Sequence, residues 1–483
     1  MKEEKTVEPS QRQALGKAMS YFDYISLGIG SIIGVGWVIV AGDWLVRGGP
    51  LGAILAFIIG GFLITIIGLC YAELTPAIPV AGGTVAFGYK AFGSATSFLA
   101  AWFLSFGYIF ICPFEAVAIG WLFEYLIPGL KSHTLYTVGT YQVSLVSIVA
   151  GVLLSLFIIA LNYRGIKYAA RFQTISTALM ILCVIVFTLV ALWKGSLSNI
   201  FPLFAREGTK WPALGSIIGV LGVVPFFMSG FDTIPQTAEE SKKKANLKDL
   251  GKAVLISIIS ASLFYAIVAL DISLCMPWKE TIKLELPTAT VFRVSFGYEW
   301  AAQLVLFTAF LGLITSFNGF FLAATRVLFS TGRGGLLPKK LGDISQKYQT
   351  PKNAILFVSL ITLAGPFVGR SSLLPIVNVT SLALVCGWLI ACLSAIRLRK
   401  IYPEMKRPYR VKSKIILYFG VMISGILILL LILPGSSAQL KWPVEYLILA
   451  VWVFLGYIGY RWRKAKKDIS DEERAFQILG DYR

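Results

Sequence analysis

Two acidic residues lie inside long apolar stretches of the chain. Glu115 stands in FICPFEAVAIG, and Asp232 stands in GVVPFFMSGFDTIPQTAEE, residues 222–240. An ionisable side chain in such surroundings is a candidate for function, because burying it carries a large free-energy cost. Glu115 could carry a proton or be bonded to a neighbouring helix. Asp232 could hold an ammonium group or a substrate side chain, or it could order the backbone around it.

The same stretches contain residues that disfavour a continuous helix. GIGSIIGVG, residues 28–36, has four glycines in nine positions, and each interior glycine costs about 1 kcal/mol of helix propensity relative to alanine. In the second stretch Pro225, Gly230 and Pro235 recur at intervals of five, and a proline removes a backbone hydrogen bond. For the glycine-rich stretch alone, close helix packing through small residues is an equal alternative.

Apolar runs of about 20 residues carry these positions and recur along the chain. Hydrophobic residues are 57% of the 483 and charged residues 14%, whereas a soluble protein has about 25% charge. We therefore expect an all-α polytopic membrane protein with little structure outside the bilayer. The twelve expected helices are 22–46, 51–75, 97–127, 143–163, 168–194, 213–237, 252–274, 298–325, 353–369, 372–396, 414–434 and 444–462.

The net charge of +19 is unevenly distributed between the two sides of this arrangement. The side that holds both termini carries 34 Lys and Arg residues, and the other side carries 10. This positive-inside bias places both termini in the cytoplasm of a plasma-membrane protein. It also explains basic runs such as Lys242–Lys244 by contact with anionic headgroups, so we expect the lipid bilayer as a partner and no nucleic acid.

Other chemistries lack a signature. The chain contains no GxSxG, HExxH or Walker A motif, and its six cysteines form no CxxC pair. We therefore expect neither an enzyme nor a metal or cofactor site, and no obligate protein partner is visible.

The two interrupted runs are the first and the sixth, an offset of five. Because five is odd, the second block of five helices enters from the opposite face, and matched interruptions in inverted halves are typical of a secondary-transporter binding site. We expect helices 1 and 6 to be broken within a five-plus-five inverted repeat, with two extra helices at the C-terminal end. The expected parts are a tail 1–20, repeats 21–195 and 213–398, helices 11 and 12 over 414–462, and a tail 463–483.

Broken helices supply ligands from their backbone. The second half of such a helix begins with free N–H groups that suit a carboxylate, and the first half ends with free C=O groups that suit an ammonium. Two facing breaks would therefore form a cradle for a zwitterion.

Four stretches resemble the amino acid–polyamine–organocation superfamily of permeases over nearly the whole chain. They are GIGSIIGVG, CYAELTPAIPVAGG (70–83), FFMSGFDTIPQTAEE (226–240) and ATRVLFSTGRGGLLPKKLG (324–342). The resemblance implies the inverted-repeat fold of the sodium-coupled leucine transporter. It also implies transport of amino acids or related amines by alternating access, often in symport with a proton.

The resemblance also implies site residues. The amides around Gly34, Val35 and Gly36 would meet the substrate carboxylate. The ammonium would meet the carbonyl groups of three residues, Ile32, Phe226 and Ser229. The Phe226 ring would cover the substrate. From their place beside the second interruption, we also expect Phe231 and Asp232 in the pocket.

Two departures from the family pattern affect substrate and coupling. Relatives often carry Ser or Thr where this chain has Val35, which leaves open an amine substrate without a carboxylate. Some members place a lysine in the fifth span where this chain has Met180, so we do not expect a lysine proton switch there.

The coupling ion is expected to be a proton carried by Glu115. Sodium is the alternative, because Thr315 and Ser316 supply adjacent hydroxyl groups in the eighth span. Of the other acidic residues, Glu73 is expected to be structural and Asp271 to be solvated near the outer surface. Glu239 and Glu240 are expected to pair with nearby lysines.

Together these features predict import of small neutral or polar amino acids by proton symport. The sequence leaves open a biogenic amine or polyamine substrate, exchange, and sodium symport. Outside the transporter class it leaves open a channel or a receptor-like permease.

Overall fold

The computed structural model describes residues 12–126, 134–138, 141–206, 210–284, 286–436, 438–466 and 469–483. The expected N-terminal tail lies outside the described residues as far as residue 11. Within the described part the chain forms helices joined by turns and irregular segments, with one antiparallel strand pair, β1 (Thr134–Val138) with β2 (Tyr141–Ser144).

The helices are, in chain order, α1 (Tyr21–Ile32), α2 (Gly36–Ala77), α3 (Gly83–Phe92), α4 (Ser94–Leu126), α5 (Leu145–Tyr163), α6 (Ile166–Lys194), α7 (Pro212–Leu221), α8 (Val224–Phe227), α9 (Thr233–Gln236), α10 (Lys248–Cys275), α11 (Trp278–Thr281), α12 (Pro287–Phe296), α13 (Glu299–Arg333), α14 (Lys352–Val368), α15 (Arg370–Ile401), α16 (Lys414–Ile432), α17 (Val444–Lys466) and α18 (Asp471–Leu479). Among the described residues, nine helices are long and apolar enough to cross a membrane, and α7 and α14 are shorter apolar helices.

The first apolar run starts with a capping box and breaks where its glycines gather. Ser20 and Asp23 bond each other's backbone at the start of α1, which satisfies amide groups that a helix leaves free. The helix ends at Ile32, and α2 begins only at Gly36. The predicted interruption is therefore present, at residues 33–35.

The run from α7 to α9 is interrupted as predicted. It is divided into α7, α8 and α9, and irregular backbone occupies residues 228–232. Pro225 lies in the short α8 and Pro235 in the short α9, where each removes one backbone donor.

α2 changes direction at Gly49 and joins two predicted apolar runs. Gly49 has φ +66°, and a Cβ there would lie 2.7 Å from the backbone nitrogen of Ala205. Glycine alone adopts this conformation at low cost, and Pro50 follows directly. The part of α2 before the kink completes the first run, and the part after it forms the second.

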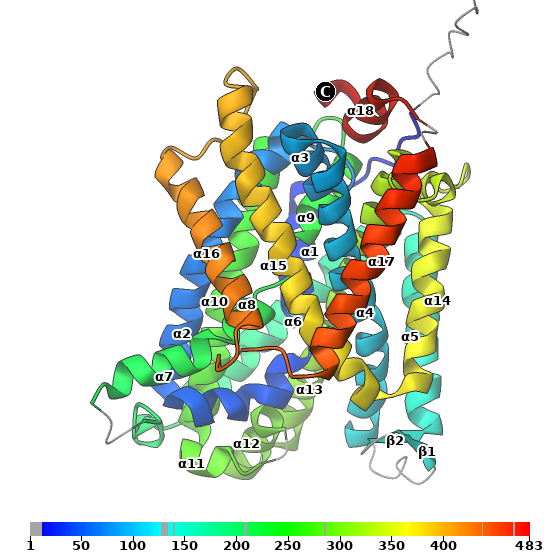
Figure 1. The fold of residues 1–483 in the computed structure, drawn as a ribbon. Helices are drawn as coiled ribbons and strands as arrows, with labels where there is room; N and C mark the ends of the chain where they lie inside the picture. Colours follow the sequence, from blue (N-terminus) through cyan, green and yellow to red (C-terminus); the bar gives the residue numbers. More distant parts are fainter. Residues whose placement is uncertain are drawn as a thin grey trace, which may run out of the picture.

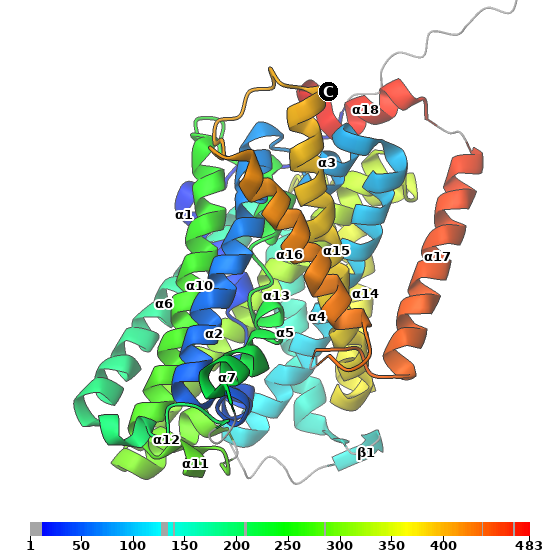
Figure 2. The same cartoon turned by 60° about the vertical axis from the view of Figure 1, so that its left-hand side comes forward.

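The long helices form one bundle, as Figure 1 shows. α13 is its most enclosed helix, with 83% of its apolar window buried, whereas α17 has 11% buried and stands at the edge of the bundle in Figure 2. α3 and α18 lie at one end of the bundle, and α11, α12 and the strand pair lie at the other (Figure 1). We refer to these as the α18 end and the α12 end.

Candidate functional site

The two interruptions lie against each other in the middle of the bundle. Gly230 has φ +126°, and a Cβ at this position would lie 2.6 Å from the carbonyl carbon of Ser31. The hydroxyl of Thr233 donates to the hydroxyl of Ser31 at 3.3 Å. The irregular backbone after α8 therefore packs directly on the last turn of α1, and only glycine fits the contact.

The first interruption presents both kinds of backbone group. The carbonyl of Ile32 accepts a 2.9 Å hydrogen bond from the hydroxyl of Tyr265 on α10 and a 3.2 Å bond from the amide of Gly34. Val35 is the N-cap of α2 and Gly36 its first residue. The first amides of a helix have no partner within it, so this end carries partial positive charge.

The second interruption brings Phe226 to a cavity of about 290 Å³ between α2, α8, α15 and α16. The hydroxyl of Ser229 donates to the carbonyl of Phe226 at 2.7 Å, and Phe226 is 40% exposed. The residues that line the cavity include Val40, Trp44, Phe226, Ser229, Trp388 and Leu431.

Phe231 occupies a different environment from Phe226. It is fully buried, and its ring packs against Tyr71 and Trp388 with centroids 5.5 and 5.1 Å away. Because Trp388 also lines the cavity, Phe231 supports the cavity wall from behind.

Asp232 is fully buried and bonded to the interrupted backbone. Its Oδ1 accepts from the amide of Gly230 at 3.1 Å, and its Oδ2 accepts from the hydroxyl of Tyr108 at 2.6 Å. Gln236 donates to the Asp232 carbonyl at 3.0 Å. The sequence left two roles open for Asp232, a substrate contact and ordering of the backbone, and these contacts match the second.

Glu115 reaches the first interruption from α4. Its Oε1 accepts a 2.7 Å hydrogen bond from the hydroxyl of Ser316 on α13. Its Oε2 is buried and has no hydrogen-bond partner in the part of the chain that the structure describes. A Cβ at Gly34 would lie 3.4 Å from Oε1, so this carboxyl group adjoins the backbone between α1 and α2.

Thr315 and Gln173 pack on α1 before the first interruption, where a Cβ at Gly30 would lie 2.4 Å from the Gln173 amide nitrogen and 2.8 Å from the Thr315 Cβ. The Thr315 hydroxyl donates to its own helix at Leu311 and Gly312. The Gln173 amide on α6 donates to the Thr315 carbonyl at 3.2 Å and to the Ser26 carbonyl at 3.4 Å. Sequence analysis missed Gln173, and the signal for it was a polar side chain in the fifth apolar run.

Met180, the position at which some members of the superfamily carry a lysine, is fully buried in α6. It forms part of the hydrophobic core.

A comparison with protein families now identifies this arrangement. The sequence model of the family described as amino acid permease matches residues 19–455, which is most of the chain. The chain belongs to the amino acid permease family. It is an integral membrane transporter and not an enzyme, and it belongs to a class that transports amino acids.

Several curated relatives cover nearly the whole permease. The branched-chain amino acid permease BcaP of Bacillus subtilis is 28% identical over 93% of this chain and 94% of its own length. The methylthioribose transporter of the same organism is 26% identical over the same shares. Its aspartate-proton symporter is 27% identical over 82% of this chain and 76% of its own length.

Ion pairs at the α18 end of the permease correct one expectation. Glu240 pairs with Arg326 at 2.7 Å, and Glu239 pairs with Arg333 at 2.9 Å and with Arg12 at 3.0 Å. The expected lysine partners were wrong, because Lys242–Lys244 point to solvent while the arginines of α13 lie in the interior. These pairs join the segment after α9 to α13.

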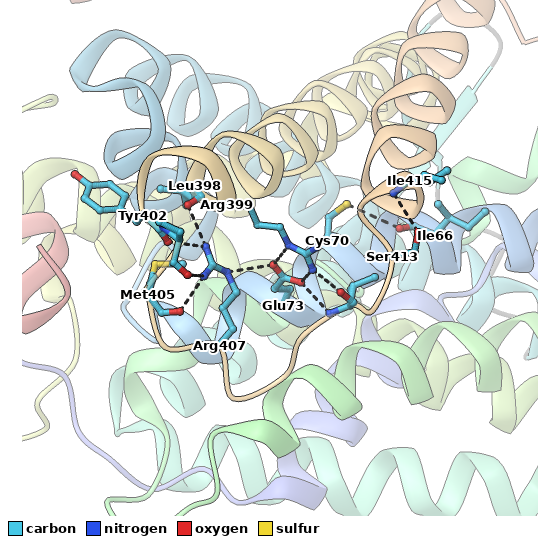
Figure 3. Close-up of polar contacts among 12 residues, drawn as sticks. Ile66, Cys70, Glu73, Leu398, Arg399, Tyr402, Met405, Arg407, Ser413 and Ile415 are labelled. Carbon is cyan, nitrogen blue, oxygen red and sulfur yellow. Dashed lines mark hydrogen bonds and ion pairs between the residues drawn. The ribbon is translucent and has the colours of Figure 1, made fainter.

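Glu73 is held between two arginines at the same end, as Figure 3 shows. Both of its oxygens accept from Arg399, and the Arg407 guanidinium lies 3.3 Å away. The amide of Val411 also donates to Glu73 at 2.9 Å. This cluster ties α2 to α15 and to the segment before α16, which is the structural role expected for Glu73.

Asp271 also differs from its expected position. It was expected near the outer surface in water, but it is fully buried in α10 and accepts a 2.6 Å hydrogen bond from Thr188 on α6. The reason is packing at the α12 end of the bundle, where the segment after α6 meets the last turn of α10. The backbone amide of Ser196 and the side-chain amide of Asn199 donate to the carbonyl of Leu274 at 2.9 and 2.8 Å.

Proposed function

We propose that the permease imports small neutral or polar amino acids by alternating access in symport with a proton. The observation that carries this proposal is the contact between the two interruptions beside a cavity. At one point in the bundle they bring together helix-start amides, helix-end carbonyls and the buried carboxyl group of Glu115.

The proposed transmembrane arrangement has twelve spans in a five-plus-five inverted repeat. The first span is α1 with the part of α2 before Gly49, and the sixth runs from α7 to α9. The remaining spans are the rest of α2, α4, α5, α6, α10, α13, α14, α15, α16 and α17. In support, the interruptions fall in the first and sixth spans of this count.

We place the α18 end in the cytoplasm of the plasma membrane, together with both termini. The excess of Lys and Arg on that side supports this orientation. The cavity at Phe226 then opens from the outer half of the bundle, since the α16–α17 connection lines its rim. The ion pairs of Glu239 and Glu240 would close the inner side, and they must separate when the site opens to the cytoplasm.

In this proposal the substrate is bound mainly by backbone groups. Amides around Gly34, Val35 and Gly36 bind the carboxylate, which suits the positive end of α2. The carbonyl groups of Ile32, Phe226 and Ser229 bind the ammonium. The Phe226 ring covers the substrate, with Phe231 and Asp232 holding the surrounding wall.

Glu115 is the proposed proton carrier. Its carboxyl group adjoins the backbone at Gly34 and has one oxygen without a hydrogen-bond partner among the described residues, so loss or gain of a proton there would change the charge next to the proposed ligand. Sodium is the alternative ion, and the hydroxyls of Thr315 and Ser316 are its candidate ligands. In this structure those hydroxyls instead donate to the Leu311 carbonyl and to Glu115.

The substrate range is tested by uptake into proteoliposomes that contain the purified permease. The panel comprises branched-chain amino acids, aspartate, an amine without a carboxylate and methylthioribose, because the relatives named above carry such different compounds. Each is tested under an imposed proton gradient and then a sodium gradient. We expect proton-driven accumulation of a small neutral amino acid, and sodium-driven uptake alone would refute the coupling.

Counterflow in the same vesicles separates a carrier from a channel or a receptor. Alternating access predicts a saturable rate that rises when unlabelled substrate is present on the opposite side. A linear rate without this stimulation would indicate a channel, and no uptake with retained binding would indicate a receptor.

A further inference from the structure

A second cavity lies at the α18 end, away from the substrate cradle. It has a volume of about 540 Å³ and is bounded by the ends of α2, α3 and α15 and by the last residues of the chain. The residues lining it include Lys90, Tyr402, Met405, Lys406, Tyr482 and Arg483. It shares none of these with the cavity at Phe226.

Three cationic side chains line this second cavity, and their contacts leave positive charge unbalanced. Lys90 donates to the carbonyl of Tyr482 at 2.5 Å and lies 4.6 Å from the centre of the Tyr402 ring. Arg483 lies over the Phe476 ring. None of these contacts is with a carboxylate, and Glu404 is the acidic side chain among the described residues that line the cavity.

Lys90 is the most enclosed of these cations. Burial lowers the pKa of Lys90, because the surrounding protein solvates an ammonium less well than water does. A bound anion would stabilise the Lys90 ammonium in place of the water that burial removes. Binding of an anion beside Lys90 is therefore energetically favourable.

The cavity wall is held by hydrogen bonds from Arg407, which adds further positive charge. Arg407 donates to the carbonyls of Leu398, Tyr402 and Met405, so it fixes the turn that follows α15 (Figure 3). Arg407 and Arg399 together share the single carboxylate of Glu73. This buried cluster therefore carries one excess positive charge directly behind the wall.

Exposed apolar side chains lie at the rim of the cavity. Ile401 and Tyr402 at the end of α15 are 43% and 44% exposed, and Pro76 and Ala77 line the cavity from the end of α2. A lipid offers both a phosphate for the cations and apolar chain for this rim, whereas a free phosphate offers only the first.

We propose that this cavity binds the phosphate headgroup of an anionic phospholipid of the cytoplasmic leaflet. The proposal rests on the orientation given above, in which the α18 end faces the cytoplasm. Basic pockets between transmembrane helices on that side are suited to anionic headgroups.

The test is native mass spectrometry of the full-length permease with bound lipid. Detergent-solubilised protein is incubated with phosphatidylglycerol or with phosphatidylcholine. The detergent is then removed in the spectrometer, and the lipid molecules that stay bound to the protein are counted. We expect preferential retention of phosphatidylglycerol. Lys90→Gln and Lys406→Gln should each lower it by about fivefold, from the contribution of one basic residue near a charged surface.

Two matched variants control for unrelated effects. Lys352→Gln removes an exposed lysine at the start of α14 and should leave retention unchanged. Lys90→Arg keeps the charge and should retain the lipid, which distinguishes loss of charge from damage to the contact with Tyr482.

Three results would overturn the proposal. The first is equal retention of the two lipids. The second is a loss of lipid in Lys352→Gln as large as in Lys90→Gln or Lys406→Gln. The third is full displacement of the lipid by millimolar glycerol phosphate, which would assign the cavity to a free anion. The measurement counts bound lipid and not transported substrate. A failure of the proposed amino acid transport would therefore leave its outcome unchanged.

Discussion

The hydroxyl of Ser316 donates a 2.7 Å hydrogen bond to Oε1 of Glu115, which joins α13 to α4 beside the interruption after α1. The second oxygen of Glu115 is buried without a partner within the described residues. A carboxyl group half satisfied in this way is costly to keep charged. This arrangement is suited to a group that gains and loses a proton during transport.

Glu115→Gln should uncouple transport from the proton gradient. The amide keeps the shape of the side chain and can accept from Ser316, but it cannot carry a proton. We expect proton-driven accumulation in proteoliposomes to be lost while counterflow exchange persists. Thr308→Ala is a control, because Thr308 is buried in α13, the helix of Ser316, and bonds its own backbone, and it should keep the coupling.

Asp232→Asn should slow transport with little change in KM. The amide of asparagine can accept from only one of the two donors, Gly230 and Tyr108, and leaving a buried donor unpaired costs about 1–3 kcal/mol. The thermal midpoint of the purified protein should fall accordingly.

A double-mutant cycle separates this role from direct substrate binding. Because Tyr108→Phe removes one of the same bonds, its effect should add incompletely to that of Asp232→Asn. A change in substrate preference with unaltered stability would instead assign Asp232 to the ligand.

The interruptions could be predicted from the sequence because they depend on local chemistry. Glycine and proline change what the backbone itself can do, so GIGSIIGVG and the stretch around Gly230 already contain the cause of each break. The apolar runs are local features too, and the gap expected between the first two, 22–46 and 51–75, contains the non-helical Gly49 that divides α2.

The partners of buried groups could not be predicted, because they come from distant parts of the chain. Glu240 and Arg326 are 86 residues apart, and proximity in sequence favoured the neighbouring lysines instead. Asp271 looked solvated because its run was ending, and only the packing at the α12 end buries it. Tyr265, whose hydroxyl bonds the Ile32 carbonyl, gave no signal in an apolar run.

Gly230→Ala should abolish transport and destabilise the protein. A Cβ there would lie 2.6 Å from the carbonyl carbon of Ser31, and the φ of +126° is unfavourable for alanine. Strain of this kind costs about 1–3 kcal/mol before any steric clash is counted. Gly425→Ala is the matched control, since nothing lies within 4 Å of a Cβ at that position of α16. Its uptake rate should equal that of the native chain and its thermal midpoint should not fall, because alanine favours a helix interior. Equal loss in both variants would contradict a special role for Gly230.

Because of the ion pairs of Glu239, the stability of the protein should decrease as pH falls. Burial alone would raise the pKa of Glu239, but Arg333 and Arg12 lower it to about 2. A carboxyl group with a lowered pKa in the folded state stabilises the protein fully above its unfolded value of about 4.5, and this contribution is lost as pH falls toward 2. Glu239→Gln should therefore lower the thermal midpoint most at neutral pH, and the difference from the native chain should narrow as pH falls below about 4.5. Exposed Glu404→Gln should show no such dependence, and a pH-independent difference for Glu239→Gln would argue against the ion pairs as its cause.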